Sequence, residues 1–208
     1  MSTPKEPGSF AIIGTLALAG LLSGLILVVV FLATQPNILA NKARALEAAV
    51  RLVVPNAASA QPYEFVGGKL QPYKGAAGVP STNPIAYAAV NSQGQPAGYA
   101  ISAEGPGFSD TIKLIYGYDA KTGRIIGMKV LESRETPGLG DKILSDAKFL
   151  SNFNALSVRP SIVPVKSGAK TLPNQVDCIT GATISSKAVV KILNSSTQQW
   201  FPRLPAGN

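Results

Sequence analysis

The stretch Asp177-Cys-Ile-Thr-Gly-Ala-Thr-Ile-Ser-Ser186 lies where a polar, proline-containing segment gives way to an apolar run with helical spacing. The segment before it, Leu172–Gln175, has the composition of a turn. After it, apolar side chains recur three to four residues apart, which predicts a helix beginning within a residue or two of Thr183. The apolar positions are Ile184, Ala188, Val189, Ile192 and Leu193.

Small residues and hydroxyls crowd the first turn of this predicted helix. Backbone N–H groups are unpaired in a first turn and the helix dipole is positive there, so the position can bind an anion. Spacing alone favours a simpler interpretation, in which Thr180, Thr183 or Ser185 caps the helix. The pattern itself leaves both interpretations open.

The composition of the 208-residue chain limits the chemistry it can perform. Its net charge is +8, but only 14% of residues are charged and no lysine-arginine block alternates with aromatic residues, so nucleic acid is not an expected partner. The absence of histidine removes the commonest general base and most zinc sites. With Cys178 as the single cysteine, the chain alone can form neither an iron–sulfur cluster nor a disulfide. Electron-transfer chemistry would therefore need an organic cofactor, and no metal site or catalytic residue is predicted.

A short tail, residues 1–9, precedes an uncharged apolar stretch, Phe10–Thr34. At 1.5 Å per residue this stretch would span roughly 37 Å as a helix, enough for a hydrocarbon layer of about 30 Å. A cleaved signal peptide would need a nearby Ala-x-Ala site, whereas Ala58-Ser59-Ala60 lies far downstream. The stretch is therefore predicted to be a transmembrane anchor.

The basic residues that flank the anchor slightly favour a cytoplasmic C-terminal domain. Lys5 lies before the anchor, and Lys42, Arg44 and Arg51 follow it.

Residues 35–84 are predicted to be an amphipathic stalk helix followed by a linker. Pro36 is expected to end the membrane helix, and Asn37–Val53 has apolar positions at helical spacing with charged residues between them. Pro55 would end the stalk helix, and the segment Ala57–Pro84 is rich in Pro, Gly, Ala and Ser. We expect little regular structure in that segment.

Two β-hairpins are predicted in the region that follows, giving an α+β domain over residues 85–200 and a tail over residues 201–208. The alternation of apolar and polar residues predicts a sheet with one buried face and one partly wet face. Between the hairpins, the Gly- and Pro-rich loop Glu104–Ser109 is expected to be free to approach a ligand. The predicted strands are Ile85–Val90, Gly98–Ser102, Thr111–Tyr118 and Arg124–Glu132.

The second hairpin leads into Glu135-Thr-Pro-Gly-Leu-Gly-Asp-Lys142. Proline followed by glycine fits the central positions of a type II turn, so Gly138 is expected to have a positive φ. Asp141 is a suitable N-cap for a helix running to about Phe153. Leu139 would be an exposed apolar side chain in need of a partner.

Two of these stretches together resemble a known family. The string Asp-x-x-Thr-Gly-Ala-Thr, ending at Thr183, resembles the flavinylation motif whose last threonine carries FMN through a phosphoester bond. The string Glu-Thr-Pro-Gly-Leu-Gly, Glu135 to Gly140, resembles a second motif of the same proteins. Over about Gly107–Leu193 the chain is similar to the G subunit of the Rnf complex, a membrane-bound ferredoxin:NAD oxidoreductase that couples electron flow to ion transport. The related C subunit of the sodium-pumping NADH:quinone reductase is the alternative.

This resemblance implies a one-flavin electron relay that is not catalytic in isolation. FMN would be covalently bound to Thr183, which needs a separate flavin transferase because the chain has no histidine to activate the hydroxyl. The partners would be the other membrane subunits of the Rnf complex. The domain would lie on the periplasmic side of the bacterial inner membrane, although the flanking basic residues favour the cytoplasmic side.

The same resemblance implies roles for the residues around Thr183. Thr180, Gly181 and Ala182 would form the turn beneath the phosphate, and the transferase would recognise Asp177. The flavin ring would lie near Glu135, Thr136, Gly138, Leu139 and Gly140.

A hypothesis of another class is a membrane-anchored module that captures a soluble anion at the helix start without any redox role. Cys178 is interpreted as a small core residue.

Overall fold

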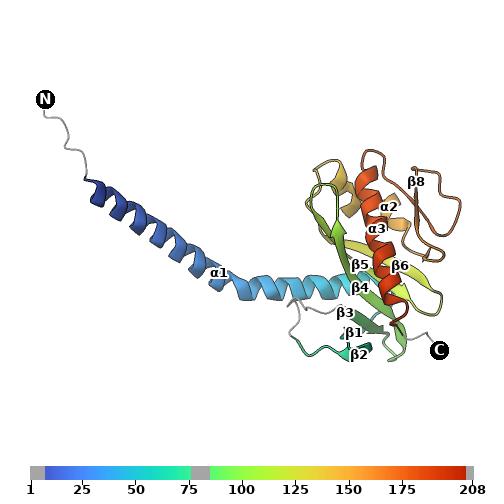
Figure 1. The fold of residues 1–208 in the computed structure, drawn as a ribbon. Helices are drawn as coiled ribbons and strands as arrows, with labels where there is room; N and C mark the ends of the chain where they lie inside the picture. The colour runs from blue at the N-terminus through green and yellow to red at the C-terminus, as the bar shows by residue number, and fades with distance from the viewer. Residues whose placement is uncertain (1–7, 76–84, 205–208) are drawn as a thin grey trace.

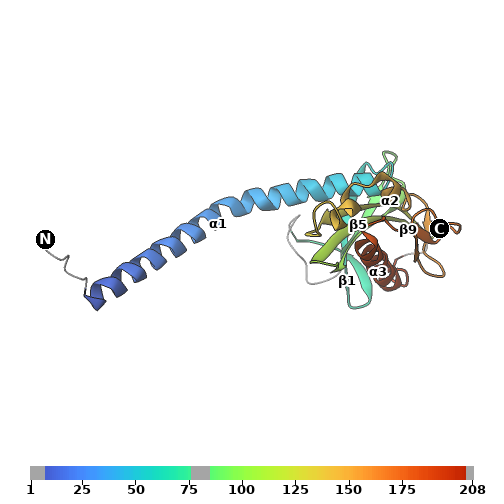
Figure 2. The same cartoon turned by 90° about the horizontal axis from the view of Figure 1, so that it is seen from above.

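The computed structural model describes residues 8–75 and 85–204, and shows a long helix projecting from a mixed α+β body (Figure 1). Helix α1 runs over Ser9–Val53 and bends midway in both views (Figures 1 and 2). Pro36 lies inside this helix, so the prediction that it ends the membrane helix is wrong. A proline removes one helical hydrogen bond and kinks a helix, but α1 continues because Val50 and Val53 in its second half pack against the sheet.

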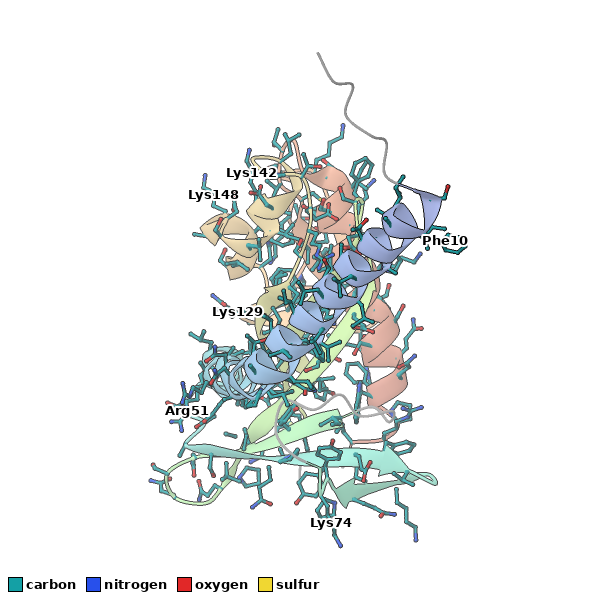
Figure 3. The ribbon with its side chains drawn as sticks, turned by 90° about the vertical axis from the view of Figure 1, so that its left-hand side faces the viewer. Phe10, Arg51, Lys74, Lys129, Lys142 and Lys148 are labelled. Carbon is teal, nitrogen blue, oxygen red and sulfur yellow. The ribbon has the colours of Figure 1, made fainter. Side chains whose placement is uncertain are left out.

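The first half of α1 is long and apolar enough to cross a membrane, and its apolar window has no burial against the rest of the described chain. Large side chains such as Phe10, Leu21 and Leu27 are at least 70% exposed. Figure 3 shows the Phe10 side chain pointing outward from the far end of the helix. An apolar helix without protein contacts needs lipid around it, which supports the predicted anchor.

The body is built on an antiparallel sheet with the strand order β2-β1-β3-β4-β5-β6-β7. Both predicted hairpins are confirmed: β3 pairs with β4, and β5 pairs with β6. The strands are β1 Ser59–Val66, β2 Lys69–Pro72, β3 Ile85–Val90, β4 Pro96–Pro106, β5 Thr111–Asp119, β6 Arg124–Glu132 and β7 Leu156–Ser157.

The expected irregular linker is partly wrong, because β1 and β2 form a hairpin within it. Gly67 and Gly68 connect the two strands with φ of 57° and 84°, as a tight hairpin turn requires. The sheet domain thus begins at Ser59, some 26 residues before the predicted boundary at Ile85. Residues 76–84 of the predicted linker lie outside the described residues.

Helices cover both faces of the sheet, so the predicted wet face is also wrong over β5. Helix α3, Thr183–Trp200, packs over one face and forms the larger apolar core with residues such as Tyr116 and Leu193. The C-terminal end of α1 covers the other face, where Val50 and Val53 pack against Ile115. Strand β5 is consequently buried on both sides along its central part.

A pair of glycines on β5 and β6 receives the end of α1. Gly117 and Gly127 are cross-strand partners beneath Val53. A Cβ on Gly127 would lie 2.7 Å from the carbonyl oxygen of Val53, and a Cβ on Gly117 would overlap the same atom. Only glycine therefore lets the helix end approach the sheet this closely. This contact joins the membrane anchor directly to the body.

The connection after β6 contains short elements in place of the predicted helix to Phe153. A 3-10 turn, η1, spans Gly140–Leu144, and a short helix, α2, spans Ala147–Ser151. Asp146, rather than Asp141, caps α2 by accepting a hydrogen bond from the Phe149 amide. Strands β8, Val163–Val165, and β9, Gln175–Asp177, then pair in parallel before α3.

The predicted C-terminal tail is not free over residues 201–204. The ring of Phe201 stacks on Tyr118 with 4.6 Å between centroids, and Leu204 is buried.

Candidate flavin site at the start of helix α3

Helix α3 begins at Thr183, as the periodicity predicts, at the end of the body opposite the β1–β2 hairpin (Figure 1). Gly181 has a φ of +84°, a conformation that side-chain-bearing residues rarely adopt, and it turns the chain into the helix. Ala182 is the N-cap and provides no side-chain hydrogen bond. The first helical bond runs from the Ser186 amide to the Ala182 carbonyl, so the preceding first-turn amides have no intrahelical acceptor. The turn presents donors to an anion.

The four hydroxyls of this stretch divide into two exposed and two buried groups. Thr180 and Thr183 are exposed, whereas Ser185 and Ser186 are buried. The Ser185 hydroxyl donates to Glu135, and the Ser186 hydroxyl donates to the Ala182 carbonyl 2.9 Å away. None of the three proposed caps bonds the helix start, so that interpretation is not confirmed. Only the two threonine hydroxyls are open to chemistry from outside.

The Glu135–Gly140 segment forms the predicted turn. Gly138 has a φ of +74°, and the Leu139 amide donates to the Thr136 carbonyl over 3.2 Å. Leu139 stays half-exposed, and its Cδ2 atom lies 3.9 Å from where a Cβ of Gly181 would be. The fold thus brings the two sequence motifs, some forty residues apart, side by side.

Glu135 joins three segments of the site through one carboxylate that is only 5% exposed. One oxygen accepts the amides of Phe108 and Ser109 at 2.8 and 3.1 Å, and the other accepts the Ser185 hydroxyl at 2.5 Å. Gly140 lies against this carboxylate: a Cβ there would be 2.7 Å from both Glu135 Oε2 and Ser185 Oγ. The buried Glu135 carboxylate therefore links the loop after β4, the Glu135–Gly140 turn and the first turn of α3.

The predicted loop Glu104–Ser109 belongs to strand β4 up to Pro106, and the backbone of its remaining residues is held in place. A Cβ on Gly107 would overlap the Glu135 carboxylate, and the Gly107 amide donates to the Asp110 carbonyl at 2.9 Å. The sequence offered Ser185 only as a possible helix cap, and Phe108 and Ser109 only as part of a loop free to approach a ligand. Their hydrogen bonds to Glu135 were not predicted.

The hydrogen bonds to Glu135 determine its charge state. Burial by itself would raise the pKa of the Glu135 carboxyl, but the bonds from Ser185, Ser109 and Phe108 outweigh burial and hold the pKa below the ordinary value of 4.5. A carboxyl whose folded-state pKa is depressed stabilises the fold above its unfolded-state pKa. That contribution is lost as the pH falls from 4.5 through the folded-state pKa.

Asp177 has structural partners of its own. Its Oδ1 atom accepts the amides of Ala169 and Lys170, both at 3.0 Å, and its own amide donates to Asn152. The carboxylate thereby holds the loop between β8 and β9, and recognition by a transferase stays a prediction. Cys178 is buried and free, in keeping with its interpretation as a core residue.

The site suits an organic phosphate. Within residues 8–75 and 85–204 there is no group of three His, Cys, Asp or Glu residues that could hold a metal ion. Thr183, by contrast, presents a hydroxyl beside first-turn amides, an arrangement that stabilises a phosphate. The residues present therefore fit a flavin mononucleotide held through its phosphate.

Comparison with known proteins agrees with this geometry. Residues 107–198 match the model of the FMN-binding domain, and these residues run from the Gly107 loop through most of α3. Residues 107–198 belong to this family. The domain thus contains the whole network around Glu135.

The curated relatives of this chain are G subunits of ion-translocating oxidoreductase complexes. The G subunit from Methanosarcina acetivorans is 29% identical over 94% of this chain and 95% of its own length. The G subunit of the Na(+)-translocating ferredoxin:NAD(+) oxidoreductase complex of Acetobacterium woodii is 36% identical over 51% of each chain. The G subunit from Aliivibrio fischeri is 37% identical over 62% of this chain and 59% of that protein. The resemblance to the Rnf G subunit is confirmed as homology.

Solved structures confirm the fold. NqrC of Shewanella oneidensis matches with a TM-score of 0.65 and 16% identity, covering 79% of this chain and 98% of that one. The C subunit of the Na(+)-translocating NADH-quinone reductase of Parabacteroides distasonis also gives 0.65, at 22% identity, over 85% and 98% of the two chains. The α+β architecture predicted from the sequence is therefore correct.

Replacing Glu135 with alanine is expected to destabilise the body by about 1–3 kcal/mol, because two amides and a buried hydroxyl lose their acceptor. The measurement is urea unfolding of the detergent-solubilised protein, followed by the fluorescence of Trp200, the single tryptophan, which is buried. Glu132→Ala, which removes only surface ion pairs, is the control and should cost less than about 1 kcal/mol. Equal stability of the two variants would contradict the role given to Glu135.

Proposed function

We propose that this protein is the membrane-anchored flavoprotein subunit of an ion-translocating ferredoxin:NAD oxidoreductase complex, and that it relays electrons through FMN bound covalently to Thr183. The observation that carries the proposal is the exposed Thr183 hydroxyl at an uncapped helix start, inside a domain of the FMN-binding family. When bound, FMN supplies reversible electron transfer, which no side chain of this protein can provide. The protein would act together with the other subunits of the complex.

The residues of the chain would hold the cofactor in distinct ways. The Thr183 hydroxyl would form the bond to phosphate, and the first-turn amides would balance the remaining negative charge of the phosphodiester. Thr180 and Gly181 would form the turn beneath the phosphate. The turn Thr136–Gly140, with Leu139 projecting from it, would border the ring. Glu135 would act through its hydrogen bonds to the loop and to α3, without reaching the ring itself.

The attachment step would need a flavin transferase and an activated flavin phosphate, such as a flavin dinucleotide. The Thr183 oxygen would bond to the phosphorus of the FMN half, the bond between the two phosphates would break, a nucleoside monophosphate would leave, and the hydroxyl proton would pass to a base of the transferase. A threonine hydroxyl is a weak nucleophile, and activation calls for a general base, commonly histidine, which this chain lacks. The exposure of Thr183 supports the proposal because an external enzyme has to reach it. A bond through the phosphate would leave the ring chemistry almost unchanged and would serve to retain the cofactor on the outer face of the membrane.

The proposal is tested by in-gel fluorescence of the full-length protein, co-expressed with a flavin transferase and separated under denaturing conditions. A yellow fluorescent band at the mass of the protein is expected. A colourless band despite active transferase would favour the anion-binding module over a flavoprotein.

The names of the relatives favour one of the two candidate complexes. They are G subunits, which favours the Rnf complex over the sodium-pumping NADH:quinone reductase.

We further propose that the domain after α1 faces the periplasm, although the basic residues near the anchor favour the opposite orientation. Long folded domains are translocated largely regardless of a few flanking charges. Protease added to right-side-out spheroplasts should therefore remove the domain. Protection in spheroplasts combined with digestion in inverted vesicles would show that the domain is cytoplasmic.

A further inference from the structure

We infer that the side chain of Phe108 packs against the flavin ring and positions it. This inference rests on the proposed attachment at Thr183. Phe108 is 65% exposed, although it lies in a loop whose backbone is firmly held: its own amide donates to Glu135 at 2.8 Å and the Gly107 amide donates to Asp110. An exposed aromatic side chain on a backbone held by hydrogen bonds is suited to contact a ligand, because the ring is already in position and exposed apolar surface often marks a binding site.

Exposed large apolar side chains are not spread evenly over the described body. Outside α1 there are seven. Three of them lie on the loop after β4, the Glu135–Gly140 turn and the start of α3, and the Glu135 carboxylate joins these three segments by hydrogen bonds. These three, which we call the apolar rim, are Phe108 from the loop after β4, Leu139 from the turn and Ile184 from the first turn of α3. The other four are Val66, Leu144, Val163 and Leu172.

Contacts place the apolar rim close to the proposed attachment point. Ile184 follows Thr183 directly, and the Leu139 side chain lies beside Gly181. Phe108 is connected through the Glu135 carboxylate to Ser185, two residues after Thr183. A ring tethered at Thr183 therefore has the apolar rim within its neighbourhood.

The chemistry of the rim selects a flat aromatic occupant. Phe108 is the only aromatic residue among the seven exposed apolar side chains of the described body. Aromatic rings associate by offset stacking or edge-to-face contact, and a planar three-ring flavin provides both a face and an edge. Aliphatic side chains such as Leu139 and Ile184 would border the same ring without competing for hydrogen bonds.

The test uses tryptophan, because an indole in contact with a flavin quenches its fluorescence by photoinduced electron transfer. The native background is low: Trp200 is the single tryptophan and lies 17 residues beyond Thr183 on α3. That separation corresponds to roughly 26 Å along the helix. Phe108→Trp is compared with Val66→Trp, which places the same group on β1, at the opposite end of the body (Figure 1).

The full-length protein carrying covalent flavin is expected to show a several-fold shorter flavin fluorescence lifetime in Phe108→Trp and an unchanged lifetime in Val66→Trp. Phe108→Ala is a second variant, in which quenching by iodide should increase about twofold because the ring loses its cover. Equal lifetimes in the two tryptophan variants would overturn the inference, because they would show that the side chain at position 108 does not contact the flavin. A wild-type protein without covalent flavin would overturn the proposed function, and the inference with it.

Discussion

The Thr183→Ala variant is expected to fold and to insert in the membrane but to carry no covalent flavin. Of the four hydroxyls in the stretch, only those of Thr180 and Thr183 are exposed, and the motif places the attachment at Thr183. The Thr183 side chain provides no helix cap, so its loss should cost well under about 1 kcal/mol, too little to unfold a domain of this size. In-gel flavin fluorescence, normalised to protein, should fall to background.

Thr180→Ala is the matched control for this result, since it removes the other exposed hydroxyl three residues away. Labelling of this variant can be reduced through weaker recognition, but the attachment point should stay at Thr183. Buried Ser185 and Ser186 are engaged with Glu135 and the Ala182 carbonyl, so they should not substitute. Undiminished fluorescence of Thr183→Ala would place the flavin elsewhere.

The Gly117→Val variant is expected to detach the end of α1 from the sheet. Even the first carbon of the new side chain would overlap the Val53 carbonyl oxygen, and neither the helix end nor the β5–β6 pair can move without opening the core around Val50 and Ile115. We expect a loss of at least about 1–3 kcal/mol in the free energy of unfolding. Limited proteolysis should show faster cleavage between α1 and β1, over residues 54–58.

Thr111→Val introduces the same side chain at an exposed position of β5 and serves as the control. Its stability and its cleavage rate should match those of the wild type. If Gly117→Val behaved like this control, the helix end would not be seated on the paired glycines. The result bears on function, because this contact joins the flavin domain to the membrane anchor.

Local signals in the sequence were sufficient for much of the fold. The strands of the two predicted hairpins have alternating apolar residues and a turn rich in small polar residues between them, so β3–β4 and β5–β6 could be located closely. The start of α3 followed from the spacing of its apolar positions. The turn at Gly138 could be predicted because a type II turn requires a positive φ at its third residue, where the sequence has a glycine after Pro137.

The errors arise where distant parts of the chain decide the structure. Pro36 should end a helix on local grounds, but the apolar face of Val50 and Val53 docks on the sheet and keeps the second half of α1 ordered. The wet face of the sheet was predicted for β5 without knowledge that α1 covers it. The β1–β2 hairpin was missed because its prolines and glycines suggested a linker.

The structure of the site also depends on contacts between distant parts of the chain. The two motifs were visible in the sequence because each is a continuous string, but the hydrogen bonds by which Glu135 joins them were not predicted. Glu135 bonds partners 27 and 50 residues away, and no periodicity or local propensity reveals such a contact. Phe108 was predicted only as part of a loop that could approach a ligand, because its position beside the site depends on this carboxylate.

The most direct test of covalent FMN attachment at Thr183 is peptide mass mapping of the wild-type protein after co-expression with its flavin transferase. Proteolysis should release a peptide containing Asp177–Ser186 with the added mass of FMN, and fragmentation should place that mass on Thr183. Thr183 should be the single modified residue. An FMN mass on Thr180 or Ser185, or on a peptide from another part of the chain, would contradict it.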